Sequence, residues 1–227
     1  MSEKINVLGV EIENIDLVKA MGRVHEYTNT EVLSTIGMIT TGVLLAAGSD
    51  LEYREKIEHL SMHVIGDKEV LAAAGIDSAE RQLEVEEGWF LTAFFEYIQE
   101  NENTLALLCE TKQECAALQN HLEEVYPRIN MVGVFALAEM AADADSIVNL
   151  INGVSADIIL ASLGIPEQEN FVFQNRTKLN VKVWLGIGKS LKIKNRPELK
   201  STFLEKLIEK RIFKKKMNQY HQKKGEL

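Results

Sequence analysis

The stretch that decides the fold is Asp157-Ile-Ile-Leu-Ala-Ser-Leu-Gly164, a short and largely apolar run that ends in glycine. Residues 166–179 follow it and are predicted to form a helix with proline in its first turn. A second apolar run comes next, at residues 181–188. Strands that are apolar along their whole length are typical of a parallel sheet covered on both faces, so these segments predict a β-α-β unit.

The same alternation extends toward the amino terminus. Strands are predicted at residues 104–109 and 129–137, and helices at 112–125 and 143–152. The earlier residues predict strands at 5–12, with Gly9 as a bulge, within 34–45 and at 62–65. They also predict helices after a cap at Asn14 or Asp16, up to Gly48, from Asp50 to Leu60, at 70–74 and at 84–97. The fold class is therefore predicted to be α/β: a Rossmann-like parallel sheet with helices on both faces, followed by a basic helical appendage at the carboxyl terminus.

Charge is distributed unevenly along the 227 residues, which carry a net charge of −9. Residues 189–227 contain 13 Lys or Arg and four Glu, so the rest of the chain holds 12 basic and 30 acidic residues. We therefore expect an acidic core domain at residues 1–190 and a basic amphipathic appendage at 191–227. The acidic body argues against nucleic acid as a partner, because proteins that read nucleic acids present a basic face.

The basic appendage predicts an anionic partner. Leu199, Phe203 and Leu207 share one helical face. A run of basic side chains follows them, at Lys210, Arg211, Lys214, Lys215 and Lys216. One interpretation is docking on an anionic membrane surface. A second is pairing with the acidic body of another subunit in a homo- or hetero-oligomer, and a third is a packed terminal helix with a solvated end.

The other features of the sequence indicate a folded cytoplasmic protein. The hydrophobic fraction of 46% and the charged fraction of 26% are ordinary for a globular chain. The amino terminus has no signal-peptide pattern, and no apolar run approaches the roughly 20 residues of a membrane-spanning helix. Cys109 and Cys115 lie in periodic apolar segments without a metal-ligand pattern, as expected for reduced thiols.

Parallel sheets bind their ligands beyond the carboxyl ends of the strands. Here those ends are predicted at residues 66–67, 109–112, 135–139, 164–169 and 186–190. Asp67 follows a short strand and is either a general base, shielded from water, or the cap of the next helix. Residues 164–169 join a strand to a helix whose first N–H groups are able to bind a phosphate, although their acidic side chains also suit a capped first turn.

Metal chemistry has little support in the sequence. Asp143-Ala-Asp145 has the form of an Asp-x-Asp metal site, but it also suits the cap of the helix that follows. The five histidines have no ligand spacing, and no complete nucleotide-binding glycine fingerprint is present. We expect no metal and no cofactor.

Several motifs in order resemble a known family. They are Ile5-Asn-Val-Leu-Gly-Val-Glu-Ile-Glu-Asn14, Asp50-Leu-Glu-Tyr-Arg54, Gly66-Asp67, Leu163-Gly-Ile-Pro-Glu-Gln-Glu169 and Val183-Trp-Leu-Gly-Ile-Gly188. Together they resemble the WecG/TagA/CpsF glycosyltransferases over residues 4–215. The resemblance implies an inverting, metal-independent enzyme that transfers a sugar such as N-acetylmannosamine from UDP to a polyprenyl-diphosphate-linked acceptor at the cytoplasmic membrane face, and that reaches the membrane through a basic appendage.

The resemblance also implies roles for individual residues. Asp67 matches the proposed base of the family. The expected donor-binding residues are Thr40, Gly164, Gln168, Glu169, Gly186, Gly188 and Lys189. Other positions depart from the family pattern: Met38 replaces a polar residue, Lys68 a glycine, and Glu84 an arginine. A second hypothesis follows from these departures, in which the chain is a non-catalytic family member that binds an active glycosyltransferase.

Overall fold

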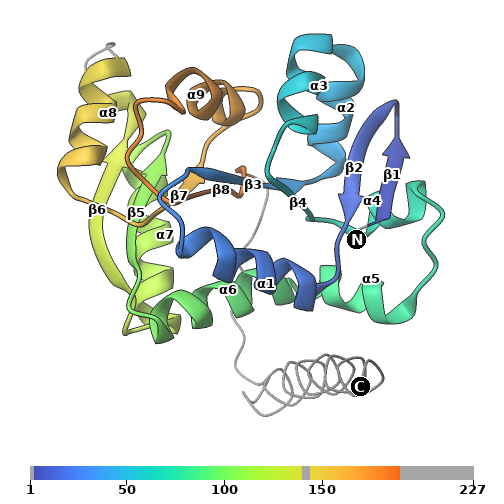
Figure 1. Cartoon of the computed structure of the whole chain (residues 1–227), viewed down its shortest axis with the longest axis horizontal. Helices are drawn as coiled ribbons and strands as arrows, with labels where there is room; N and C mark the ends of the chain where they lie inside the picture. The colour runs from blue at the N-terminus through green and yellow to red at the C-terminus, as the bar shows by residue number, and fades with distance from the viewer. Residues whose placement is uncertain (1–2, 140–143, 190–227) are drawn as a thin grey trace, which may run out of the picture. The chain divides into compact units, whose positions relative to one another are not determined.

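The computed structural model of the chain describes residues 3–139 and 144–189. The predicted basic appendage and Asp143 lie outside these residues. The described part contains a parallel sheet with the strand order β4-β3-β8-β7-β5-β6 (Figure 1). Its strands are β3 (Ser34–Ile39), β4 (Met62–Ile65), β5 (Thr104–Cys109), β6 (Asn130–Ala136), β7 (Ile158–Ser162) and β8 (Val183–Gly186). Every pairing between neighbours is parallel, so the predicted sheet is confirmed.

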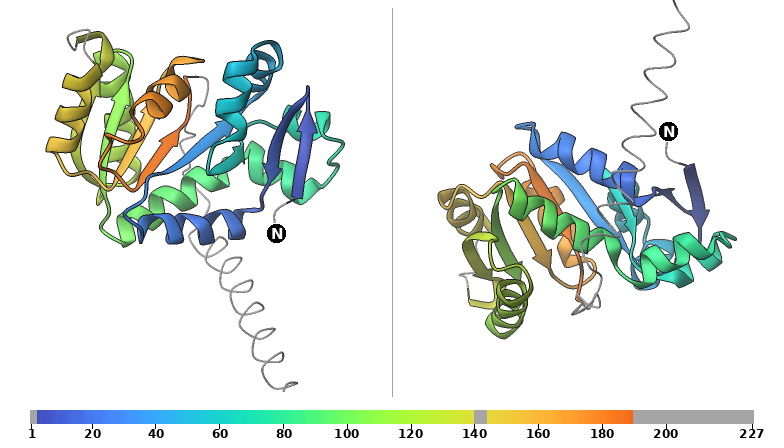
Figure 2. Two further views of the ribbon diagram at one scale, coloured as in Figure 1. Left: turned by 45° about the horizontal axis from the view of Figure 1, so that its top comes forward. Right: turned by 90° about the horizontal axis from the view of Figure 1, so that it is seen from below.

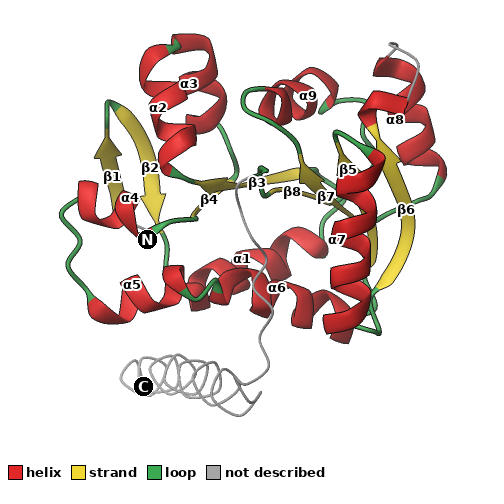
Figure 3. Cartoon of the chain, turned by 180° about the vertical axis from the view of Figure 1, so that it is seen from behind, coloured by secondary structure: helices red, strands yellow, loops and turns green. Residues whose placement is uncertain are grey.

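Helices cover both faces of this sheet. On one face α8 (Ala144–Gly153) and α9 (Glu167–Asn175) pack over β5, β7 and β8, where Trp184 is 1% exposed and stacks on Phe171. On the other face α1 (Leu17–Thr28) and α6 (Trp89–Glu100) lie side by side (Figure 2). Seen from behind, α7 (Lys112–Val125) lies beside β5 and β6 (Figure 3). The continuous apolar runs of the strands follow from this two-sided burial.

The predicted strand at residues 5–12 is wrong, because the segment forms a separate hairpin of β1 (Glu3–Val7) and β2 (Val10–Asn14). Gly9 is not a bulge: it shares a two-residue turn with Leu8, and both have positive φ, of 80° and 55°. Such turns match the twist of the flanking strands. The hairpin packs against α2 (Thr41–Ser49), α3 (Leu51–Glu58), β4 and α4 (Lys68–Ala73) in its own apolar cluster.

The predicted helix at residues 84–97 is also interrupted. The segment contains the end of α5 (Ala79–Glu86) and most of α6, and Gly88 between them has a φ of 64°. Glycine adopts this left-handed conformation without steric cost, so it ends one helix and starts the next. The core role expected for the aromatic residues of α6 is confirmed, because Phe90, Phe94 and Phe95 are all at most 5% exposed.

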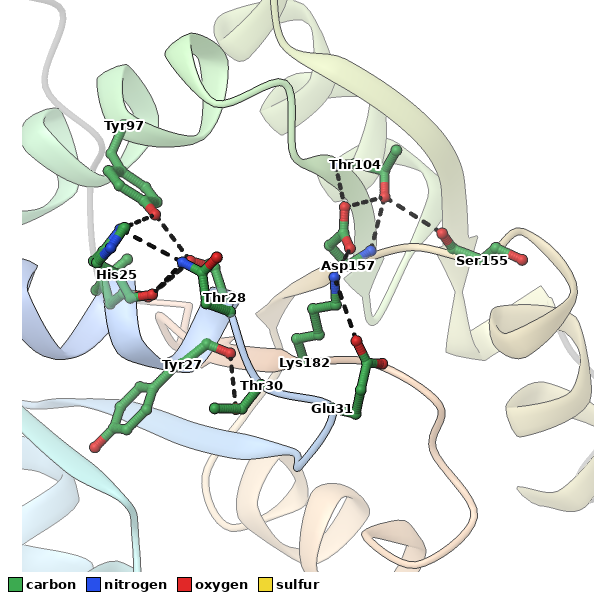
Figure 4. Close-up of polar contacts among 12 residues, drawn as sticks. His25, Tyr27, Thr28, Thr30, Glu31, Tyr97, Thr104, Ser155, Asp157 and Lys182 are labelled. Atoms are coloured by element: carbon green, nitrogen blue, oxygen red, sulfur yellow. Dashed lines mark hydrogen bonds and ion pairs between the residues drawn. The ribbon is translucent and has the colours of Figure 1, made fainter.

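Polar contacts tie together the amino-terminal ends of three strands (Figure 4). Asp157, before β7, accepts hydrogen bonds from the backbone N–H and the hydroxyl of Thr104 at 3.0 and 2.9 Å, and Lys182 Nζ lies 2.9 Å from its other oxygen. Burial acts to raise the pKa of Asp157, but Thr104 and Lys182 outweigh it and hold that pKa below its usual value. These contacts fix the strand register at the edge opposite the strands' carboxyl ends.

Within the described residues, no helix combines the length and the apolar composition that crossing a bilayer requires.

Candidate functional site

A pocket of about 260 Å³ lies at the carboxyl edge of the sheet. It is formed by the ends of β3 and β8, the start of α2 and the connection from β7 to α9. Its lining residues are Met38, Thr40, Val43, Gly164, Ile165, Gln168, Ile187, Gly188 and Lys189. The fold therefore brings together Thr40, Gly164, Gln168, Gly188 and Lys189, which the sequence analysis had proposed as donor-binding residues from separate segments.

The pocket adjoins the point where the chain direction reverses. β5 continues through α7 to β6 on one side, whereas its neighbour β7 continues through α9 to β8 on the other side. In open α/β sheets, ligands occupy the crevice outside such a switch point. Here the switch point lies between Glu110, which follows β5, and the loop after β7 that contains Gly164.

Asp67 lies next to the pocket but does not line it. Its carboxylate caps α4 by accepting the Val70 N–H at 3.2 Å, which confirms the cap interpretation. It also accepts the backbone N–H of Thr41 at 2.7 Å and the Thr41 hydroxyl at 3.0 Å. Thr41, which the sequence analysis did not single out, joins Asp67 to the pocket residue Thr40, which caps α2.

Three donors already contact the carboxylate of Asp67. A carboxylate offers about four acceptor positions. The N–H groups of Thr41 and Val70 and the Thr41 hydroxyl use three of them. The remaining position, on a half-buried group, is able to accept the proton of a substrate hydroxyl.

Gln168 and Glu169 are buried, at 4% and 3% exposure, and bind other protein groups. Gln168 Nε2 donates to Glu169 Oε1 at 2.9 Å, and Gln168 Oε1 accepts the Gly188 N–H at 2.9 Å. Tyr53 donates its hydroxyl to Glu169 Oε2 at 2.9 Å. Burial raises the pKa of Glu169, against the effect of these hydrogen bonds. Tyr53 had no proposed role, although the motif Asp50-Leu-Glu-Tyr-Arg54 contained it.

The two glycines at the end of β8 serve this hydrogen-bond chain. A Cβ atom at Gly186 would lie 2.4 Å from Gln168 Nε2, so the side chain of Gln168 packs where only glycine leaves room. Gly188 has a φ of 65° and gives its N–H to Gln168. Gln168 therefore determines the path of the chain from Gly186 to Lys189 along the pocket wall.

Charged side chains gather at the switch point. Lys189 Nζ lies 3.2 Å from Glu114 Oε1 and forms an ion pair with Glu110. A Cβ atom at Gly164 would lie 3.0 Å from Glu167 Oε2 and 4.0 Å from Glu110 Oε2, so two carboxylates flank that glycine. The hydrogen bond to Glu110 raises the pKa of Lys189, and Glu114 acts in the same direction.

A buried ion pair occupies the region where the family resemblance places an arginine. Glu84 forms an ion pair with Arg81, and Arg81 also donates to Asn14 Oδ1 at 3.1 Å and to the Ile15 carbonyl at 2.6 Å. Both side chains are about 10% exposed, at 11% and 9%. A cation is therefore present one helical turn before position 84, and it joins α5 to the end of the hairpin.

The described residues include no group of three or more His, Cys, Asp or Glu side chains that could hold a metal ion. His63 is buried in β4, where Nε2 donates to the Ile57 carbonyl at 2.8 Å and Nδ1 accepts the Glu13 N–H at 3.4 Å. Both ring nitrogens of His63 therefore bind backbone groups of the protein.

Comparisons with known proteins identify the family of the chain. The model of the glycosyl transferase WecG/TagA/CpsF family matches residues 5–194. An N-acetylglucosaminyldiphosphoundecaprenol N-acetyl-beta-D-mannosaminyltransferase of Staphylococcus aureus strain MRSA252 is 20% identical over 198 residues, which cover 84% of this chain and 75% of the relative. The protein of the same name from strain NCTC 8325 / PS 47 is 19% identical with the same coverage. Since the family match runs from the hairpin past the last strand of the sheet, the chain belongs to the WecG/TagA/CpsF family of glycosyltransferases.

Proposed function

We propose that this glycosyltransferase moves an N-acetylmannosamine-like sugar from a UDP donor to a polyprenyl-diphosphate-linked acceptor in the synthesis of a cell-surface polysaccharide or wall polymer. The observation that carries the proposal is the pocket at the carboxyl edge, which joins Thr40, Gln168 and Lys189 and adjoins Asp67. The relatives named above act on an undecaprenol-diphosphate-linked N-acetylglucosamine and transfer N-acetylmannosamine, which supports the choice of donor and acceptor.

In this reaction Asp67 is the base. It takes the proton of the acceptor hydroxyl while that oxygen forms a bond to the anomeric carbon of the donor sugar and the bond from that carbon to UDP breaks. Thr40 and Gly164 border the donor. Lys189 and the glycines before it lie near the diphosphate, where a cation compensates the charge that develops on the leaving group. Gln168 and Glu169 act on the donor through the chain segment that they hold.

The acceptor determines where the enzyme works. A polyprenyl-linked substrate resides in a membrane, and we propose that the basic run from Lys210 to Lys216 docks the enzyme on the anionic inner face of the cell membrane. In that arrangement the enzyme is cytoplasmic and peripheral.

One observation supports a second candidate function. Lys189 is the only cationic side chain among the described residues that line the pocket, and two carboxylates already pair with it. A family member that has lost donor binding and acts as the partner of an active glycosyltransferase would tolerate this arrangement.

Thermal unfolding in the presence of UDP and a panel of UDP-sugars separates the two functions. A ligand at 100 times its dissociation constant stabilises the folded state by about 2.7 kcal/mol. We expect a stabilising UDP-sugar, loss of the effect in Gln168→Ala, and release of UDP when a short-chain polyprenyl-diphosphate-linked N-acetylglucosamine is added. If no ligand stabilises the protein while an active family member responds to the same panel, the catalytic proposal is wrong.

A further inference from the structure

The ion pair at the switch point joins residues that follow two strands which are not neighbours in the sheet. Lys189 follows β8, and Glu110 follows β5, with β7 between them in the sheet. The lysine side chain therefore reaches across the carboxyl end of β7 to meet Glu110 and Glu114. The contact covers the place where the fold leads us to expect a ligand.

The two carboxylates are held differently. Glu114 belongs to a capping box: its Oε2 accepts the Thr111 N–H at 2.9 Å, and its own N–H donates to the Thr111 hydroxyl at 3.2 Å. Glu114 is thus fixed at the start of α7. The side chain of Glu110 is 51% exposed and pairs with Lys189, with Glu167 on the other side of Gly164.

A diphosphate and these carboxylates would both bind the ammonium group of Lys189. Phosphate oxygens bind ammonium groups through charge-assisted hydrogen bonds, as carboxylates do. With Lys189 paired to Glu110, an entering diphosphate meets the carboxylates of Glu110 and Glu167 and an ammonium group whose charge is already compensated. When Lys189 leaves Glu110, the ammonium becomes available, but the glutamate remains as a repulsive charge.

We propose that Glu110 is an affinity-limiting residue that competes with the donor diphosphate for Lys189, so that the ion pair must open before UDP or a UDP-sugar binds. This inference deepens the proposed function and rests on it. Glu110 touches neither Asp67 nor the Gln168–Glu169 pair by any contact found among the described residues. Its effect is therefore expected on nucleotide affinity and on the KM of the donor, with little change in kcat.

Titration calorimetry on the full chain tests the competition, with UDP and inorganic pyrophosphate as the two probes. We expect Glu110→Gln to bind both probes about two- to fivefold more tightly than the wild type, since an exposed ion pair contributes at most about 1 kcal/mol. Lys189→Met should bind them more weakly. In the double variant the gain from Glu110→Gln should largely disappear, because the ammonium for which the glutamate competes is gone.

Glu123→Gln is the matched control. Like Glu110→Gln, it removes one negative charge, but it does so near the carboxyl end of α7, where the Glu123 side chain accepts a hydrogen bond from Gln119. We expect its affinities to equal those of the wild type. The advantage of Glu110→Gln should also shrink as salt rises, because salt weakens ion pairs between solvent-exposed side chains.

The outcomes separate the inference from the function. If UDP binds the wild type and Glu110→Gln binds no more tightly, the competition is wrong and the donor site stands. An equal gain with and without Lys189 indicates simple repulsion by Glu110 and also overturns it. If pyrophosphate alone behaves as expected, the competition stands and the UDP donor is wrong. If no variant binds either probe, both are wrong.

Discussion

Tyr53 donates its hydroxyl to Glu169 across 2.9 Å, joining α3 to α9 in a buried contact between residues 116 positions apart in the sequence. Burial raises the pKa of both groups, with Tyr53 shifted well above its usual range. Through Gln168 this contact reaches the N–H of Gly188 at the pocket wall. A residue outside the pocket thus helps to position the chain segment that we assign to the donor.

Removing the Tyr53 hydroxyl deprives the buried carboxyl group of Glu169 of one hydrogen-bond donor. We expect Tyr53→Phe to lower the free energy of unfolding by about 1–3 kcal/mol, and to weaken UDP binding. Urea unfolding and calorimetry measure the two effects. Tyr27→Phe is the control, since the Tyr27 hydroxyl donates to the Ser61 carbonyl in an exposed contact and its loss should cost less. Equal stability of Tyr53→Phe and wild type would refute the coupling.

Adding a methyl group at Gly186 should displace Gln168. The new Cβ would lie 2.4 Å from Gln168 Nε2, so Gly186→Ala is expected to destabilise the protein by about 1–3 kcal/mol and to reduce nucleotide affinity. Gly22→Ala is the matched control, because nothing lies within 4 Å of its Cβ position in α1. Alanine favours a helix interior by about 0.5–1 kcal/mol over glycine, so that variant should be stabilised. Thermal unfolding of both variants measures the difference in sign.

The two roles of Asp67 can be separated by substitution. Asp67→Asn keeps an oxygen for the helix cap but removes the base, so sugar transfer should fall by at least about 100-fold while UDP still binds. Asp67→Ala should also lower the free energy of unfolding by about 0.5–2 kcal/mol through loss of the cap. Ser78→Ala removes the cap of α5, which accepts the Arg81 N–H, and should cost stability alone. Full activity of Asp67→Asn would rule out the catalytic role.

His63 should make the fold sensitive to acid. Burial lowers its pKa below the usual 6.5, and its neutral ring both accepts the Glu13 N–H and donates to Ile57. Because the unfolded state then binds more protons than the folded state, the His63 contribution is complete above about pH 6.5 and is lost as the pH falls toward the lowered value. Urea midpoints of wild type and His63→Gln between pH 5 and 8 measure it. We expect a weaker pH dependence in the variant, and a constant difference across this range would contradict the assignment.

The sequence was informative where burial is uniform. The runs at residues 104–109, 157–164 and 181–188 are largely apolar because the sheet is covered on both faces, so strands and their parallel arrangement followed directly. It failed where one residue changed the local backbone. Gly9 turns a presumed strand into a hairpin, and Gly88 divides a presumed helix. Local apolar spacing carries no sign of either break.

The sequence by itself determined the α/β class and predicted a site at the carboxyl edge, and the family resemblance added the candidates Asp67, Thr40, Gln168 and Lys189. Only the tertiary structure decided which other groups these residues contact. The insertion of β8 between β3 and β7 brings Lys189 within reach of Glu110, and the packing of α3 on α9 gives Glu169 its partner Tyr53. Strand order and helix packing depend on the burial of surfaces distant in sequence, and the pattern around one residue does not record which remote side chain will meet it.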